Sequence, residues 1–220
     1  MTLDRLLTGL PDPAGPFLTY YDDGTGERVE LSGVTTANWV AKTSNFLVDD
    51  LEAEPGTRVR LGVPSHWLRF VWMLSCWSVG AAVVEADADI GLSGPELVAD
   101  EPVRVAASLR PLGGRFADPP AGFLDIGAEV PAHGDVFVPI DPPGPDTLAL
   151  DVDGRRATQA ELTSETEPSD ERLLVVPGPM RRDVDLLVAA GLGGGSLVIV
   201  VNASEETIGR LAEQERAQVR

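Results

Sequence analysis

The stretch 66–79 limits the folds open to this chain more than any other part of the sequence. It is apolar nearly all round when drawn as a helix, and Arg69 is the one charged residue inside it. A helix that is hydrophobic on every side is buried either in a large core or in a membrane. A membrane span needs about 20 apolar residues, whereas this stretch has only 14 residues. We therefore expect a helix at the centre of a protein core.

The segments on either side of this helix predict a parallel sheet. Residues 58–63 (R-V-R-L-G-V) turn from alternating to apolar, as a strand that enters a core does. Gly80 suits the end of the helix, and residues 81–86 (A-A-V-V-E-A) form a run typical of a buried parallel strand. A strand, a helix and a second strand at this spacing predict a right-handed crossover.

An amphipathic helix is expected just upstream, capped by Ser32 and opening at Gly33. Its inward positions recur every three or four residues. They are Val34, Ala37, Val40, Ala41, Ser44, Leu47, Val48 and Leu51. Pro55-Gly56 ends the element, so this helix should pack one face on the core.

The rest of the chain alternates between strand and helix patterns. Strands are expected at 17–21, 28–31, 103–108, 148–152, 155–157, 173–176 and 197–201, with weaker candidates at 122–126 and 136–140. Helices are expected at 3–10, 95–100, 180–192 and 205–217, and the capping box of Thr158 and Glu161 opens another. D-D-G-T-G at 22–26 and Asp153-Gly154 are hairpin turn signals. This alternation predicts the α/β class, with a mostly parallel sheet and helices on both faces.

The length of 220 residues favours a single domain over 1–220. The sequence D-P-P-G-P-D at 141–146 is the clearest break in the chain. It marks a candidate sub-boundary inside this domain.

The charge of the chain excludes several classes of partner, and its cysteine content indicates its cellular location. The chain has 17 Lys and Arg against 35 Asp and Glu, a formal charge of −18. Nucleic acids and anionic membrane surfaces are bound by clustered basic charge, so we expect neither as a partner. One cysteine cannot form an internal disulfide and suits the cytosol. The first residues lack a long apolar run, so no signal peptide is expected and a cytoplasmic location is predicted.

A sequence of motifs resembles a known family of enzymes. E-P-G-T-R-V-R-L-G-V-P-S at 54–65 precedes the apolar helix, and G-A-A-V-V at 80–84 follows it. This order is similar to the N-terminal part of AMP-forming acyl-CoA synthetases, the adenylate-forming superfamily. R-L-L-V-V-P at 172–177 and G-G-G-S-L-V-I-V-V at 193–201 resemble a later part of the same domain. In size and content the chain looks most like a family of short, uncharacterised bacterial proteins that resemble truncated synthetase N-domains.

The resemblance also implies residues that this chain lacks. The synthetases hold ATP phosphates with a Ser/Thr/Gly-rich loop that ends in lysine. At 147–162 the chain instead reads T-L-A-L-D-V-D-G-R-R-A-T-Q-A-E-L, with Asp151 and Asp153 where phosphates would lie. Lys42 is the only lysine and belongs to the amphipathic helix, and the family's adenine- and ribose-binding segments would follow residue 220. The resemblance therefore implies a non-catalytic relative, more a binding or interaction module than an enzyme, with no catalytic residues and no cofactor.

Arg155 and Arg156 are the candidate nucleotide-binding residues, because a pair of guanidinium groups can clamp a phosphate. The alternative, a solvated hairpin strand, is the explanation that we favour. If they bind phosphate, the protein is a nucleotide- or acyl-CoA-binding sensor, or one subunit of a split AMP-forming ligase. The glycines at 191–195 follow a helix and precede a strand, which is the reverse of a dinucleotide-binding loop, and so they indicate a helix end.

Other residue types give no site. Glu85, Asp87 and Asp89 are too few for a calcium site, and His66 and His133 have no metal-ligand spacing, so we expect no metal. Cys76 and the three tryptophans of the 66–79 stretch are interpreted as core residues.

The resemblance carries one more expectation. In the full enzymes this region packs against a second subdomain, so its absence should leave an apolar face that needs cover. We predict a homodimer or a complex with another protein.

Overall fold

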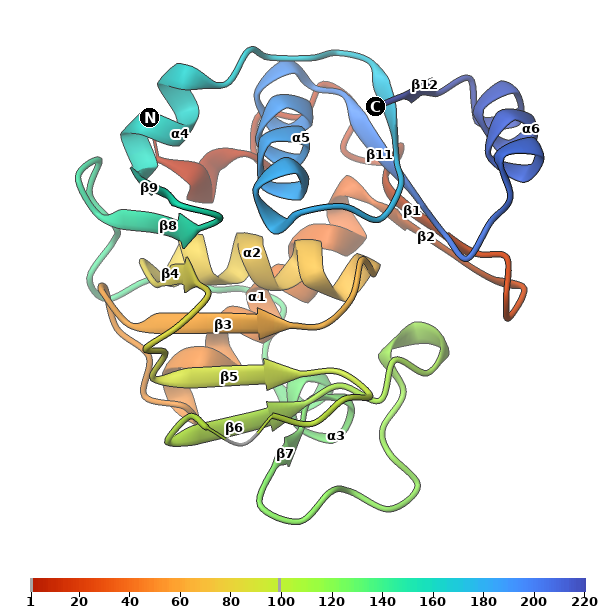
Figure 1. The fold of residues 1–220 in the computed structure, drawn as a ribbon. Helices are drawn as coiled ribbons and strands as arrows, with labels where there is room; N and C mark the ends of the chain where they lie inside the picture. The colour runs from red at the N-terminus through yellow and green to blue at the C-terminus, as the bar shows by residue number, and fades with distance from the viewer. Residues whose placement is uncertain (1, 99) are drawn as a thin grey trace.

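The computed structural model describes residues 2–98 and 100–220, and in them the strands form two sheets (Figure 1). The first has the order β12-β10-β11-β1-β2 and the second β7-β6-β5-β3-β4-β8-β9. All neighbouring strands in this part of the chain run parallel except the hairpins β1–β2 and β8–β9. The α/β class is confirmed, with the strands divided between two mostly parallel sheets.

The bounds of the elements are as follows. The first sheet contains β1 (Pro16–Asp22), β2 (Glu27–Ser32), β10 (Arg172–Val175), β11 (Ser196–Val201) and β12 (Gln218–Val219). The second contains β3 (Arg58–Gly62), β4 (Ala82–Val84), β5 (Ile90–Ser93), β6 (Val103–Ala106), β7 (Leu124–Asp125), β8 (Leu148–Val152) and β9 (Arg155–Thr158). The helices are α1 (Gly33–Asp49), α2 (Trp67–Val79), α3 (Ile126–Glu129), α4 (Gln159–Glu165), α5 (Met180–Gly193) and α6 (Glu205–Glu215). Short 3₁₀ turns lie at Leu3–Arg5, Pro111–Gly113 and Val130–Ala132.

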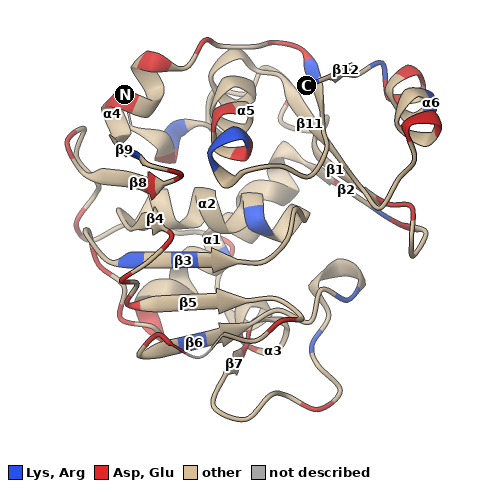
Figure 2. Ribbon diagram, viewed as in Figure 1, with Lys and Arg blue, Asp and Glu red and all other residues tan. Residues whose placement is uncertain are grey.

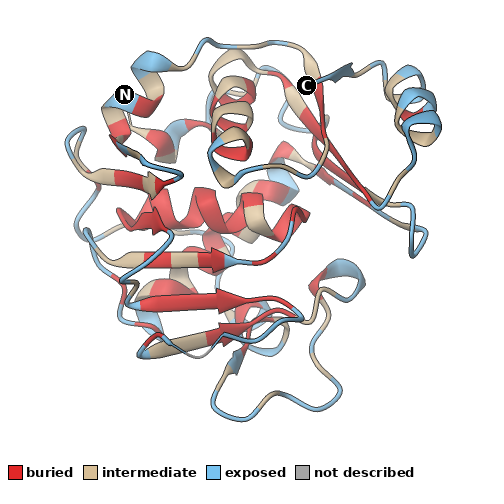
Figure 3. Ribbon diagram, in the orientation of Figure 1, coloured by how far each residue is buried: buried red, intermediate tan, exposed pale blue. Residues whose placement is uncertain are grey.

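The central helix predicted from the apolar stretch is α2, and every residue in it except Arg69 is buried (Figure 3). It contacts β1 of the first sheet and both β3 and β4 of the second. His66 caps its start, and Gly80 ends it in the left-handed region with φ +91°. The indole Nε1 of Trp77 donates to the carbonyl of Ala149 at 3.0 Å. One hydrophobic core therefore joins both sheets through α2.

Helix α1 begins at the predicted cap, since the Ser32 side chain accepts from the Thr35 N–H. Its buried face differs from the predicted one, because Val34 is 51 % exposed and Phe46 is fully buried. Phe46 packs edge-on against Trp72 of α2, and this aromatic contact sets the rotation of the helix. Thr36 is buried in place of Val34, since its hydroxyl donates to the Ser32 carbonyl and leaves no unpaired polar group.

The prediction for residues 87–102 was wrong in two ways. It missed β5, which lies inside the second sheet between β3 and β6. The acidic residues that precede β5 made this part of the sequence look like a loop. In the structure Asp89 accepts the Arg58 N–H and aligns the two strands. The expected helix at 95–100 is absent from the residues described there, and residue 99 lies outside them. Ser93 explains the difference, because its hydroxyl both donates to and accepts from the backbone of Val98 and holds an irregular loop.

Two further expectations need correction. Residues 136–140 form no strand with any described part of the chain, although the weaker candidate at 122–126 does contain β7. The helix expected at 3–10 is only the 3₁₀ turn Leu3–Arg5, because Pro11 and Pro13 follow too soon for a longer helix. The other predicted strands and helices lie within a few residues of their predicted positions, whereas α3 and β12 were not predicted.

Helix α6 covers the outer face of the first sheet through Leu211, which packs with Leu174, Val198 and Val200. The acidic residues lie mostly in loops and on outer helices such as α6 (Figure 2). In the described part of the chain, no helix is both long and apolar enough to cross a lipid bilayer.

Candidate ligand-binding cleft

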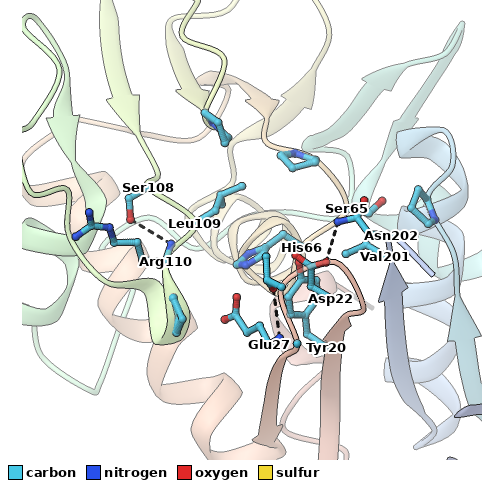
Figure 4. A pocket seen from close by; sticks show the side chains of 16 residues that line it. Tyr20, Asp22, Glu27, Ser65, His66, Ser108, Leu109, Arg110, Val201 and Asn202 are labelled. Atoms are coloured by element: carbon cyan, nitrogen blue, oxygen red, sulfur yellow. Dashed lines mark hydrogen bonds between the residues drawn. The ribbon is translucent and has the colours of Figure 1, made fainter. Parts of the chain in front are cut away.

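A cleft of 870 Å³ opens where strands of both sheets end (Figure 4). The residues that line it are Tyr20, Asp22, Thr25, Gly26, Glu27, Pro64, Ser65, His66, Pro95, Ser108, Leu109, Arg110, Pro111, Pro177, Val201 and Asn202. They follow or end β1, β3, β5, β6, β10 and β11, and so lie at the carboxyl ends of parallel strands. Ligands of open α/β sheets bind at this edge. The cleft is therefore the candidate functional site.

His66 supplies a buried hydrogen-bond donor to the wall of this cleft. Its side chain is 2 % exposed, and its Nδ1 accepts from the Leu68 N–H at 3.2 Å. This bond assigns the proton of the neutral ring to Nε2, which has no hydrogen-bond partner among the described residues. Burial lowers the pKa of His66 to about 4, although the nearby Asp22 carboxylate opposes the shift. The ring stays neutral near pH 7.

Tyr20 lies against His66, with the ring centroids 4.6 Å apart and the rings nearly edge to face. Burial, together with the charges of Asp22 and Glu27, raises the pKa of the Tyr20 phenol. The hydroxyl is therefore neutral and can donate as well as accept.

The β1–β2 hairpin gives this wall its acidic character. Burial works to raise the pKa of Asp22, but hydrogen bonds from Asn202, Thr25 and Gly24 outweigh it and keep the pKa below its usual value. The Asn202 amide donates to Asp22 at 2.8 Å and the Gly24 N–H at 2.9 Å. Burial and the charge of Asp22 raise the pKa of Glu27, whose Oε1 is buried without a partner in the described part of the chain. Glu27 thus offers an unused acceptor.

The opposite wall is the loop after β6, and Figure 4 shows Ser108, Leu109 and Arg110 on that side. The Ser108 hydroxyl accepts from the Arg110 N–H at 3.2 Å and donates to the Gly114 carbonyl. Leu109 and Leu112 have φ of +53° and +57°, a region that costs non-glycine residues free energy and that is common at ligand sites. This wall is therefore a strained, internally bonded loop.

The floor and rim combine apolar and polar surface, as small-molecule sites do. Pro64, Pro95, Pro111, Pro177 and Val201 supply the apolar part. The described residues contain no group of three or more His, Cys, Asp or Glu side chains able to hold a metal ion. Such a cleft can bind a partly apolar small molecule.

The predicted arginines lie elsewhere, on β9. Arg155 bonds to Asp185 at 2.6 Å and to Glu165 at 3.0 Å, and these carboxylates raise its pKa against the opposing effect of burial. Arg156 is exposed and lies 3.9 Å from Asp151. Neither residue lines the cleft.

The turn between β8 and β9 is the predicted tight hairpin. Asp153 and Gly154 have φ of +50° and +71°, as a two-residue hairpin turn requires. The Asp153 N–H donates to Glu85 at 2.9 Å, and its carboxylate accepts from the Arg181 N–H at 3.1 Å. This backbone offers no loop of free N–H groups.

The other residues considered from the sequence have structural surroundings. Cys76 is fully buried, which raises the pKa of its thiol. Gly194 ends α5 in the left-handed region, so the glycine run is a helix end. Lys42 bonds to Asp135 at 2.7 Å.

The sequence analysis missed the cleft because six segments that are distant in the chain build it. His66 was considered only as a metal ligand, although its place directly after the Pro64-Ser65 turn signalled a strand end.

No family model matches the sequence. A TIGR03089 family protein from Mycobacterium tuberculosis is 36 % identical over 229 residues, covering 97 % of this chain and 93 % of the relative.

Solved structures show the fold. An acyl-CoA synthetase from Brucella canis superposes with a TM-score of 0.79 at 12 % identity, covering 100 % of this chain and 47 % of that one. The N-terminal domain of FACL13 from Mycobacterium tuberculosis gives 0.69 at 14 % identity, with 99 % and 61 % covered. Acetoacetyl-CoA synthetase from Streptomyces lividans gives 0.68 at 16 % identity, with 99 % and 41 % covered. This chain thus spans about half the length of these solved chains.

Proposed function

The chain belongs to the TIGR03089 family and has the fold of the N-terminal part of acyl-CoA synthetases, and from this premise we propose that it is a non-catalytic binding module of that fold. Its binding site is the cleft between the two sheets. It works without adenylation, and its location is the cytoplasm.

One observation carries the proposal, namely the β8–β9 hairpin, which lies at the point in chain order where the resemblance to the synthetases implies a phosphate loop. A phosphate is held by several free backbone N–H groups and a nearby cation. Here the turn has two residues, the Asp153 N–H already donates to Glu85, and the Asp153 carboxylate lies at the turn itself. Arg155 already forms ion pairs with two carboxylates. An ATP triphosphate would meet negative charge at this point.

The cleft supports a binding role independently. Its volume of 870 Å³ suits a small molecule. Its lining combines apolar residues with polar side chains such as Asp22, Ser65 and Asn202, as small-molecule sites do.

Pyrophosphate exchange with a panel of carboxylic acids, ATP and magnesium tests the loss of catalysis. We expect no exchange above a sample of heat-denatured protein. Exchange that survives purification over two columns would refute the proposal.

A second candidate function is a nucleotide- or acyl-CoA-binding sensor, or a subunit of a split AMP-forming ligase. The size of the cleft and the coverage of only half of the solved synthetase chains favour it. Thermal shift against ATP, AMP, CoA and acyl-CoAs separates the two candidates. A ligand at 100 times its Kd adds about 2.7 kcal/mol of stability, a shift of several degrees for a chain of this size. A shift with any of these ligands would favour the sensor, and no shift with any of them would favour the first candidate.

A further inference from the structure

The segment 134–141 presents a row of aliphatic side chains to solvent. Val136, Val138 and Ile140 are 76 %, 77 % and 99 % exposed, whereas Phe137 between them packs against the core. Outward and inward positions alternate, as they do along a β-strand. No strand in the described part of the chain pairs with these residues. The segment therefore has the side-chain pattern of an edge strand but no neighbour.

Side chains of α1 hold this segment in place. The Asn45 amide donates to the carbonyls of Gly134 and Val136, each at 3.0 Å. Lys42 bonds to Asp135, and the His133 ring bonds to Asp50 at 2.8 Å. The aliphatic row is thus preformed, so a partner would not have to order it on binding.

A groove of 340 Å³ runs beside the row. Its apolar lining comes from Val48, Ala53, Pro55, Val79, Phe137, Val138, Pro139 and Ile140. Its charged lining consists of Asp49, Glu54 and Asp141, and no lysine or arginine lines it. The groove lining is therefore mostly apolar, with three carboxylates as its charged groups.

From this charge pattern we propose that the segment 136–140 and its groove are a docking site for another protein, which binds through an extended aliphatic segment flanked by lysine or arginine. Docking of an extended segment is a common mode of recognition, in which pockets for alternate side chains give specificity; here the aliphatic row supplies most of the contact, because the Val136 carbonyl is already bonded and Pro139 has no N–H. Basic flanks would meet the three carboxylates of the groove.

A second copy of this chain fits the site poorly. It would bring another Asp49, Glu54 and Asp141 to the same groove, and each copy carries a formal charge of −18. Like charges placed together across an interface disfavour the complex. The occupant is therefore a basic partner, and this inference does not depend on what the cleft binds.

Fluorescence anisotropy with three labelled seven-residue peptides tests the site. The first peptide alternates lysine and valine, the second lysine and serine, and the third glutamate and valine. We expect the full chain to bind the lysine–valine peptide at least about tenfold more tightly than either of the others. Equal binding of the lysine–valine and lysine–serine peptides would mean that only net charge attracts them, and would overturn the proposal.

The double variant Val138→Asp/Ile140→Asp sharpens this test. It adds two negative charges, so a purely electrostatic attraction would strengthen, whereas docking on the aliphatic row should weaken about tenfold. Val34→Asp/Val219→Asp is the matched control, because it adds the same charge at positions 51 % and 54 % exposed, and it should retain binding. Unchanged binding in the first variant refutes the site. A dimer in light scattering that the first variant dissociates would identify a second copy as the occupant and also refute the proposed partner.

Discussion

Replacing His66 with asparagine should make the stability of the protein less sensitive to acid. His66 is buried and neutral, and its pKa falls from 6.5 to about 4 in the folded state. The unfolded chain therefore binds a proton at a pH where the folded chain does not, and the folded state loses stability as the pH falls from 6.5 towards 4. Above pH 6.5 both states are neutral, so the histidine costs nothing there.

The magnitude follows from the shift. A depression from 6.5 to about 4 corresponds to about 3.4 kcal/mol when the loss is complete at low pH. Between pH 8 and pH 5 the same two pKa values give a loss of about 2 kcal/mol. Asparagine has no such proton and can still cap α2 through its side-chain oxygen.

Urea denaturation of both proteins at pH 8, 7, 6 and 5 measures this effect. We expect the unfolding free energy of the wild type, relative to His66→Asn, to fall by about 2 kcal/mol over this range. The many carboxylates are common to both proteins and cancel in the comparison. Repeating it in a His133→Asn background guards against a contribution from the other histidine. A relative stability that stays constant from pH 8 to pH 5 would show that His66 is not held neutral, and the argument for its free donor in the cleft would fail.

Two further substitutions and one chemical modification test the core. Asp183 is fully buried and bonds to Arg69 at 2.7 Å. Asp183→Ala leaves the charge of Arg69 without this partner, so it should lower the unfolding free energy measured in urea by about 3–5 kcal/mol. A loss under about 1 kcal/mol would contradict this role. Burial raises the pKa of Cys76, so a thiol reagent should react with it only after denaturant is added, and fast reaction of the native protein would argue against the buried position. Gly80 has φ +91° and lies against Pro55, so Gly80→Ala should lower the unfolding free energy by about 1–2 kcal/mol and with it the temperature of the thermal midpoint. An unchanged midpoint would contradict the strain.

Local pattern was enough to predict some elements and not others. Helix α2 was predictable because its apolar residues leave it no exposed face, and the β8–β9 hairpin because Asp153-Gly154 allows few other turns. Strand β5 was not, since the acidic residues before it are typical of a loop, although Asp89 accepts the Arg58 N–H of the neighbouring strand. The outward turn of Val34 depends on the contact of Phe46 with Trp72, which no local pattern contains. The same holds for the cleft, because an atom of Glu27 and an atom of His66 become buried without a hydrogen-bond partner only when the two sheets come together.

The pairing of β1 with β11 sets an order of events during synthesis. Leu18 of β1 lies beside Leu197 of β11. Strand β1 is synthesised early and cannot form this pairing until β11 has been synthesised near the end of translation. At about 5–20 residues per second, the wait lasts about 10–35 s. Meanwhile the second sheet has its strands from β3 to β9 and can form around α2. The first sheet, whose strands β1 and β11 both contribute residues to the cleft, is complete only after β11 leaves the ribosome, so the second sheet can form before the cleft exists.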